Sequence, residues 1–173
     1  TEIGDNKMKK KINGQIISQK EIAPGIFDMW IATELAADAK PGQFVGVYPK
    51  TESTLLPRPI SICEVKEDKT ALRLVYRVQG KGTDQFSKMK EGEVVALLGT
   101  LGNGFPLEEG KGKNCFLIGG GIGVPPILQL AKEIQGEKNI FVGNLFSYPD
   151  IPVELSLDFL RKKPYIQVDF AEN

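Results

Sequence analysis

The pattern of apolar residues changes near residue 110, and this change constrains the fold more than any other feature of the sequence. Before it, short runs rich in β-branched and aromatic residues recur between turns such as Ala23-Pro24-Gly25 and Lys40-Pro41-Gly42. Short, evenly spaced strands with Gly/Pro turns predict an antiparallel barrel or sandwich. The strands are expected at residues 11–19, 26–33, 43–48, 59–65, 71–78 and 94–98.

A short helix is predicted at residues 83–89, ahead of the last of these strands. Thr83 is expected to be its N-cap, because a threonine hydroxyl can accept a hydrogen bond from an unpaired N–H of the first turn. Phe86 and Met89 are expected to face the core.

Beyond residue 113, strands and helices alternate. The apolar run at 114–118 leads into a cluster of glycines and then into a helical pattern at 126–134, whose apolar residues share one face. Further elements are expected as strands at 140–142 and 165–170 and as a helix at 153–160. This order predicts a βαβ series with a parallel sheet.

Only about three strands fit after residue 113, whereas a doubly wound domain usually has about five or six. The second unit is therefore expected to be a partial α/β nucleotide-binding domain, and the chain to be a fragment of a longer protein. The expected organisation is a tail at 1–10, a barrel domain at 11–107 and the partial α/β domain at 113–173.

The composition excludes several kinds of chemistry. No histidine is present among the 173 residues, which rules out Ser-His-Asp and Cys-His catalysis and histidine-ligated metal sites. Two cysteines, Cys63 and Cys115, are too few for a four-cysteine zinc or iron–sulfur site. They are expected to be reduced core residues rather than a disulfide or reactive thiols.

The charge balance and the N-terminus bear on partners and location. The 22 basic and 22 acidic side chains give zero net charge, so neither nucleic acid nor an anionic membrane is expected as a partner. The first residues, Thr1–Lys11, are polar and rich in lysine, and are expected to be neither a signal peptide nor a membrane span. A cytoplasmic location is the expectation.

The segment Arg58-Pro59-Ile60-Ser61 is a candidate ligand site. Pro59 favours an extended Arg58, whose guanidinium can bind a phosphate through two parallel hydrogen bonds. Ser61 lies two residues further along the strand from Pro59 and can hydrogen-bond a ring nitrogen. The plainer interpretation is a surface arginine before a barrel strand.

A second candidate follows Tyr76-Arg77, which lie on a predicted strand and point to opposite faces. The loop Gly80-Lys81-Gly82-Thr83 comes next. Glycines let backbone N–H groups approach an anion, and the threonine hydroxyl can also bind phosphate. An ordinary loop with a capping threonine is the alternative.

The third candidate is Gly119-Gly120-Gly121-Ile122-Gly123, which follows an apolar strand and opens a helix. A dinucleotide-binding fingerprint requires this context, although Val124 stands where the third glycine of the full pattern would be. Pro125 and Pro126 suit the first helical turn. A tight strand-to-helix turn without a ligand is the alternative.

Taken in order, these motifs and the segment Leu101-Gly102-Asn103-Gly104-Phe105 resemble the ferredoxin-reductase superfamily. More narrowly, residues 11–143 are similar to the electron-transfer subunits of bacterial class 1B dihydroorotate dehydrogenases. The resemblance implies an all-β antiparallel Greek-key barrel that binds FAD, followed by an α/β parallel-sheet domain that binds NAD.

The resemblance also implies roles for individual residues. Arg58 would pair with the FAD pyrophosphate, and Gly82 and Thr83 would hold the phosphates. Ser61 would be catalytic at the reactive edge of the isoalloxazine, with backbone contacts from Pro59 and Ile60. The other implied cofactor contacts are Val75, Tyr76 and Arg77 along the flavin, and Gly119, Gly120, Gly121, Ile122 and Gly123 at the nicotinamide dinucleotide.

The family further implies a partner and a pathway. Its partner is a dihydroorotate dehydrogenase catalytic subunit that carries FMN, in a heterotetramer, and electrons pass through FAD to NAD+ in pyrimidine biosynthesis. Family members prefer NADH, but Gly143-Asn144 stand where an acidic residue could have separated NADH from NADPH. The [2Fe–2S] centre expected in the family needs a C-terminal cysteine cluster, which this sequence lacks, and the similarity is lost beyond Asn144.

Two other functions stay open. One is a stand-alone NAD(P)H-flavin reductase of the same superfamily, which would be active without a partner. The other is a non-catalytic remnant domain that has kept the fold and lost the chemistry, and it would not take up FAD.

Overall fold

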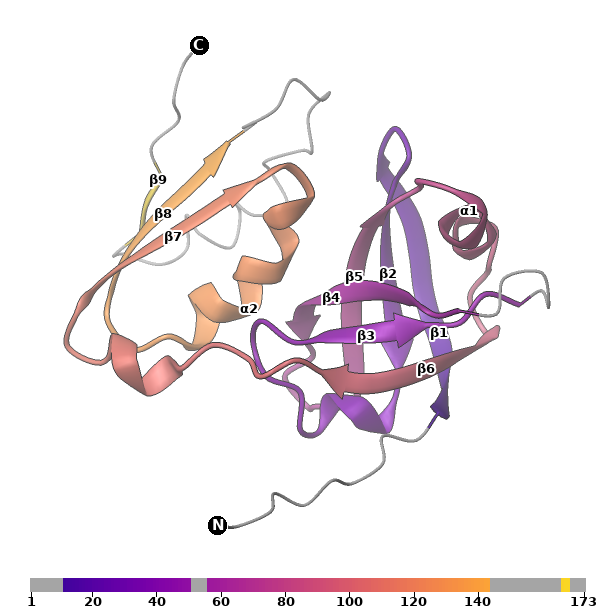
Figure 1. Cartoon of the computed structure of the whole chain (residues 1–173), viewed down its shortest axis with the longest axis horizontal. Coiled ribbons are helices and arrows are strands. Elements are labelled where there is room, and N and C mark those ends of the chain that lie inside the picture. The colour runs from indigo at the N-terminus through magenta and orange to yellow at the C-terminus, as the bar shows by residue number, and fades with distance from the viewer. Residues whose placement is uncertain (1–10, 51–55, 144–165, 169–173) are drawn as a thin grey trace.

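The computed structural model describes residues 11–50, 56–143 and 166–168. A closed antiparallel barrel comes first, and a small parallel sheet with a helix follows it (Figure 1). The predicted fold class is therefore confirmed.

Six strands close the barrel in the order β1-β2-β5-β4-β3-β6. In this order β5 lies next to β2 and β6 lies next to β1, so strands that are not consecutive in the sequence are neighbours, as in a Greek key. Each predicted barrel strand is present, and β1 and β6 run beyond their predicted ends. The strands are β1 (Lys11–Ala23), β2 (Ile26–Ala32), β3 (Phe44–Val47), β4 (Arg58–Val65), β5 (Ala71–Arg77) and β6 (Val94–Leu101).

The barrel core follows from the alternation of side chains along the strands. On β2, Phe27, Met29 and Ile31 alternate with their neighbours and face inward, and the last two are almost fully buried. Each such side chain contributes roughly 1.5–3 kcal/mol by leaving water. The other large members of this core are Ile16, Val45, Val47, Ile62, Leu72, Leu74, Tyr76, Phe86 and Leu97.

Helix α1 (Lys81–Ser87) begins two residues earlier than predicted, and its N-cap is Gly80. The prediction that Thr83 is the N-cap was wrong, because Thr83 lies inside the first turn. Its hydroxyl accepts a hydrogen bond from the N–H of Gln79 (2.8 Å) and donates one to the carbonyl oxygen of Gly80 (3.2 Å). Phe86 and Met89 lie in the barrel core as predicted.

The α/β unit confirms the predicted βαβ order. Its strands β7, β8 and β9 are parallel and lie in that order in the sheet. Its elements are β7 (Asn114–Gly120), η3 (Gly121–Gly123), α2 (Pro125–Glu133), β8 (Glu137–Gly143) and β9 (Ile166–Val168). The helix predicted at 153–160 lies outside the described residues.

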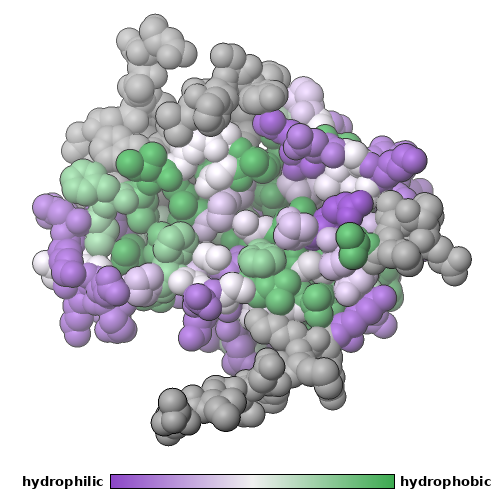
Figure 2. Space-filling view, viewed as in Figure 1, coloured by the Kyte–Doolittle hydropathy of each residue, from purple (hydrophilic) through white to green (hydrophobic). Residues whose placement is uncertain are grey.

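Helix α2 packs against both parts of the protein. One face contacts the parallel sheet through a core of Leu117, Leu130, Ala131 and Ile140. Leu128 faces the other way and packs on the outside of the barrel. Figure 1 shows α2 between the sheet and the barrel, and Figure 2 shows that hydrophilic side chains gather mainly around the rim of this face.

Helical structure is otherwise short. Two further 3-10 turns, η1 (Glu34–Ala36) and η2 (Leu107–Gly110), precede the parallel sheet. At nine residues, α2 is the longest helix in the described ranges. A bilayer-spanning helix needs about 20 apolar residues, so none of the helices in these ranges could cross a membrane.

Candidate functional site

The start of β4 and the first turn of α1 meet at one corner of the barrel. Arg58, the first residue of β4, lies against Gly82, which is buried. A Cβ added at Gly82 would come within 2.7 Å of Nε and 3.3 Å of Cζ of Arg58. The guanidinium can approach the backbone of α1 this closely only because residue 82 is glycine.

Local bonds give this corner its shape. Nη1 of Arg58 donates a hydrogen bond of 3.0 Å to the carbonyl oxygen of Leu56. Gly80 has φ of 131°, a conformation that favours glycine, and no atom lies within 4 Å of the position that its Cβ would take. The corner therefore combines a cation with a stretch of backbone that a ligand can approach.

Ser61 is exposed on the outer face of β4. Pro59 is exposed beside it, while Ile60 packs against the barrel core. Continuing along the same outer face, Cys63 is buried beneath Leu128 of α2. Ser61 therefore lies on β4 between the Arg58 corner and the helix of the α/β unit.

The strand β5 holds the predicted Val75-Tyr76-Arg77 segment with its side chains on different sides. Val75 is buried on the outside of the barrel, in the cluster that contains Leu128. Tyr76 is buried inside the barrel, and burial raises the pKa of its hydroxyl above the usual range. The side chains of Val75 and Tyr76 thus have packing partners within the protein.

Gln19, which sequence reasoning missed, holds α1 against this strand. Its Oε1 accepts a hydrogen bond of 2.9 Å from the Tyr76 hydroxyl, and its Nε2 donates to the carbonyl oxygens of Phe86 (2.9 Å) and Met89 (2.7 Å). The carbonyl of Phe86 lies in the last turn of α1, where it also accepts a hydrogen bond of 3.0 Å from the N–H of Met89, and the carbonyl of Met89 lies just beyond the helix. A β-bulge between Ile16 and Ser18 changes the face on which Gln19 lies, and the sequence pattern carries no signal for it.

The glycine cluster connects β7 to α2 as predicted. A Cβ at Gly119 would lie 2.8 Å from Cδ1 of Ile127 and 3.1 Å from Cα of Val124, so this glycine allows strand and helix to pack closely. Gly121 has φ of 54°, and neither Gly121 nor Gly123 has an atom within 4 Å of its Cβ position. The turn is therefore open to a ligand at these two glycines, whereas Gly119 serves packing.

The α/β unit contacts two strands of the barrel. The turn η3 contacts β5 of the barrel, and α2 contacts β4, which carries Arg58 and Ser61. The contact of η3 with β5 brings the third sequence motif, 119–123, to the strand that carries Tyr76 and Arg77. The contacts of α2 with β4 complete the seam between the barrel and the α/β unit, and they lie at Cys63, Glu64 and Val65, at the opposite end of β4 from Arg58.

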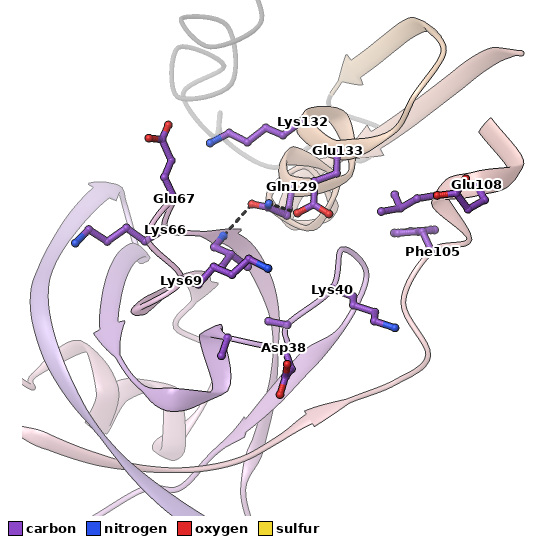
Figure 3. Close-up of a pocket in the computed structure, with 14 residues that line it drawn as sticks. Asp38, Lys40, Lys66, Glu67, Lys69, Phe105, Glu108, Gln129, Lys132 and Glu133 are labelled. Atoms are coloured by element: carbon purple, nitrogen blue, oxygen red, sulfur yellow. Dashed lines mark hydrogen bonds between the residues drawn. The ribbon is translucent and has the colours of Figure 1, made fainter. Parts of the chain in front are cut away.

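A cavity of about 1050 Å³ opens elsewhere on this seam, beside the second half of α2 (Figure 3). Its lining includes none of the predicted site residues. Four lysines and four acidic residues line it, namely Lys40, Lys66, Lys69, Lys132, Asp38, Glu67, Glu108 and Glu133. This balanced charge gives no preference for the phosphates of a dinucleotide.

The cysteines and acidic residues do not gather into a metal site within the part of the chain that the structure describes. The described ranges contain no group of three or more metal-ligating side chains. Cys63 is 2% exposed, and burial raises the pKa of its thiol to about 12. Cys115 is half-buried, with its sulfur 3.7 Å from the carbonyl oxygen of Gly110.

Curated relatives cover most of this chain. The protein "Dihydroorotate dehydrogenase B (NAD(+)), electron transfer subunit" of Listeria monocytogenes serotype 4a is 44% identical over 124 residues, which are 71% of this chain and 49% of that protein. Its namesake in Lysinibacillus sphaericus is 38% identical over 159 residues, 90% of this chain and 62% of that protein. The chain spans about half the length of the first of these relatives. No family model matches it.

Solved structures agree on the fold. An NADH-dependent reduced ferredoxin-NADP oxidoreductase superposes with a TM-score of 0.76 at 25% identity, over 96% of this chain and 59% of that one. A ferredoxin NADP+ reductase from Neisseria gonorrhoeae, solved with bound FAD and NADP, superposes with a TM-score of 0.73 at 21% identity, over 95% of this chain and 70% of that one.

The barrel, the parallel sheet and these superpositions define the fold of ferredoxin-NADP+ reductases, which are flavin-dependent oxidoreductases linked to NAD(P). Within that class, the chain is homologous to the electron transfer subunits of dihydroorotate dehydrogenase B. The resemblance inferred from the motifs is thereby confirmed.

Proposed function

We propose that this chain binds FAD on its barrel and a nicotinamide dinucleotide at its glycine turn, and passes electrons between them. Residues 11–107 would form the FAD domain and residues 113–173 part of the NAD domain. The observation that carries this proposal is the contact of Arg58 with Gly82, because it presents a forked cation beside approachable backbone. Pyrophosphate is recognised by such an arrangement.

The residues of the Arg58 corner would bind the FAD phosphates. Arg58 would donate to the pyrophosphate, and the backbone at Gly82 would approach it. Thr83 would act by fixing the loop, since its hydroxyl is already bonded to Gln79 and Gly80. The structure fits this role, because a side chain at 82 would displace the arginine.

Ser61 would orient the flavin ring. It is exposed on β4 between the Arg58 corner and α2, and its hydroxyl can donate to or accept from a ring nitrogen. The backbones of Pro59 and Ile60 would lie along the ring, and β5 would contribute Val75, Tyr76 and Arg77 mainly through backbone atoms, since the first two side chains are buried.

The turn formed by Gly119, Gly120, Gly121, Ile122 and Gly123 would hold the nicotinamide dinucleotide. Its open glycines allow a ligand to approach the backbone, and its contact with β5 would place that ligand beside the flavin. When bound, FAD supplies the hydride chemistry with nicotinamide, and the protein binds and orients the two rings. No histidine is needed for such a transfer.

We also propose the partner that the relatives' name implies. In the whole protein, electrons would come from a dihydroorotate dehydrogenase catalytic subunit carrying FMN. The two cysteines of this sequence cannot by themselves bind a [2Fe–2S] cluster, which takes four ligands. Co-elution of the chain with such a catalytic subunit on size exclusion would support the partnership, and separate elution at micromolar concentration would count against it.

The test of the main proposal is a visible absorbance spectrum, recorded before and after addition of FAD and then of NADH without oxygen. Flavin absorbance that stays with the protein through gel filtration and bleaches with NADH is the expected result. Retained flavin that does not bleach would remove the nicotinamide half of the proposal. A protein that takes up no flavin would overturn the proposal and favour a non-catalytic domain.

A further inference from the structure

We propose that a charge network between the barrel and α2 fixes the helix in one position, and thereby sets the glycine turn 119–123 at a defined distance from Ser61. The network consists of Asp28, Arg73, Glu64 and Lys132, with a hydrogen bond from Gln129 beside it. The first part of this inference stands on geometry alone. The second part, the placement of nicotinamide against flavin, rests on the proposed function.

The network begins on the outside of the barrel with Arg73 of β5. Nε and Nη2 of Arg73 donate to the two carboxylate oxygens of Asp28 at 2.9 and 2.8 Å, and Nη1 donates to Oε2 of Glu64 at 3.0 Å. Trp30 lies beside the guanidinium, 5.9 Å from ring centroid to Cζ. With three of its donors fixed, Arg73 holds the carboxylate of Glu64 in one orientation.

Glu64 then links the barrel to the helix. Its second oxygen, Oε1, accepts a hydrogen bond from Nζ of Lys132 on α2. The side chains of Arg73, Asp28 and Glu64 are only 11%, 5% and 16% exposed, and that of Lys132 is 23% exposed. Two cations and two anions thus balance in a place with little water, where an unbalanced charge is costly.

A neutral hydrogen bond fixes the same helix one turn earlier. Oε1 of Gln129 accepts a 2.8 Å hydrogen bond from the N–H of Val65, and Gln129 is 6% exposed. Figure 3 shows Gln129 and Lys132 reaching from α2 toward the barrel. Because Val65 directly follows Glu64, the two links hold α2 against a single short stretch of β4.

The apolar contact alone would not give this precision. Leu128 packs on Ile26, Cys63 and Val75, and such contacts tolerate small sliding movements because the hydrophobic effect has no direction. Directed bonds at 129 and 132 fix the rotation and height of α2. The helix rises about 1.5 Å per residue, so Lys132 controls the position of the glycine turn, whose near end is nine residues and roughly 13 Å away.

The first test measures whether α2 stays on the barrel, and it needs no cofactor. Cys63 lies beneath Leu128, so its reaction with a thiol reagent reports exposure of this contact. In a Cys115→Ser background, Lys132→Met, which keeps the stem of the side chain and removes its charge, is expected to raise the Cys63 labelling rate at least about tenfold, equivalent to about 1.4 kcal/mol. Lys132→Arg is expected to label like the parent.

Lys50→Ala is the matched control, because it removes an exposed ion pair with Glu93 away from α2. Its labelling rate should equal that of the parent. Equal rates for Lys132→Met and the parent would overturn the inference. An increase of the same size in Lys50→Ala would overturn it too, since labelling would then report general loosening.

The second test separates this inference from the proposed function. The measurement is the rate at which NADH reduces the bound flavin in the parent and in Lys132→Met, with FAD affinity recorded for both. The inference expects unchanged FAD affinity and reduction slowed at least about fivefold, with recovery in Lys132→Arg. Equal reduction rates would remove the positioning role. A parent that binds no FAD would refute the proposed function, while the labelling result would still decide the link between Lys132 and the barrel.

Discussion

The hydroxyl of Tyr76 donates a 2.9 Å hydrogen bond to Oε1 of Gln19, and this pair joins β5 and β1 to the end of α1. The Tyr76 ring also meets Phe86 of α1 edge-on, with 6.0 Å between centroids. The same strand that carries Arg77 therefore holds the helix whose first turn contacts Arg58. Stability of the barrel and geometry of the candidate phosphate site are coupled through these residues.

Replacing Tyr76 by phenylalanine should lower the free energy of unfolding by about 1 kcal/mol, because Oε1 of Gln19 would lose its donor in a partly buried place. Gln19→Met should cost about 2–3 kcal/mol, since the side-chain hydrogen bonds to the carbonyl oxygens of Phe86 and Met89 are lost as well, although Phe86 keeps the N–H of Met89. Urea unfolding at constant pH measures both values. Two variants of equal stability would show that Gln19 does not act through α1.

Gly119 and Gly123 should respond differently to alanine. Gly119→Ala places a Cβ 3.1 Å from the backbone of Val124 and 2.8 Å from Ile127, so we expect a loss of about 1–3 kcal/mol in the α/β unit. Gly123→Ala meets no atom within 4 Å and should leave stability within about 0.5 kcal/mol. Hydrogen exchange of the β7 amides compares the two, and equal protection in both variants would contradict the assignment of Gly119 to packing.

Stability should fall at alkaline pH because of Cys63. Burial raises the pKa of the folded-state thiol to about 12, whereas an unfolded thiol ionises near about 8.5. The stability that this group contributes is thus fully present below about pH 8.5 and is lost as pH rises toward 12, with about 2 kcal/mol gone by pH 10. Urea unfolding measured from pH 7 to 10 should show that the free energy of unfolding falls less steeply with pH in Cys63→Ala than in the parent. An equal fall in both proteins would contradict this.

Gly82→Ala should weaken FAD binding at least about tenfold with little loss of stability. The new Cβ would meet Arg58 at 2.7 Å, and the arginine is the more movable of the two groups, so its guanidinium would turn away from the ligand. Ser87→Ala, which removes a hydrogen bond to the carbonyl oxygen of Asp84 in the same helix, is the control and should bind FAD as the parent does. Flavin fluorescence titration gives the three affinities, and unchanged binding by Gly82→Ala would separate this glycine from the site.

Sequence reasoning predicted the barrel because its strands alternate clearly and end at Gly/Pro turns. It also predicted the βαβ order, since the glycine cluster stands between a strand pattern and a helix pattern. The N-cap of α1 was misplaced because glycine carries no side-chain signal for a cap, and threonine does. In fact Gly80 caps the helix with φ of 131°, and Thr83 ties the preceding loop to it.

Other parts of the site could not be predicted from local pattern. Arg58 and Gly82 lie on separate elements. Their sequence motifs show that each segment could bind an anion, but not that the two residues are in contact. The burial of Val75 beneath α2 depends on how the helix of one unit packs on the other. The same holds for Glu64 and Lys132, which lie 68 positions apart in the sequence and are joined only by the fold.

The role of Arg58 in FAD binding is tested by the FAD dissociation constants of the parent, Arg58→Lys and Arg58→Ala, obtained by flavin fluorescence titration with unfolding curves recorded alongside. If Arg58 binds the pyrophosphate through its fork, Arg58→Ala should weaken binding by about 10²-fold, and Arg58→Lys should fall between it and the parent, because lysine keeps the charge and loses the second parallel bond. Equal affinities in all three folded proteins, or no FAD binding by the parent, would contradict the binding of FAD pyrophosphate by Arg58.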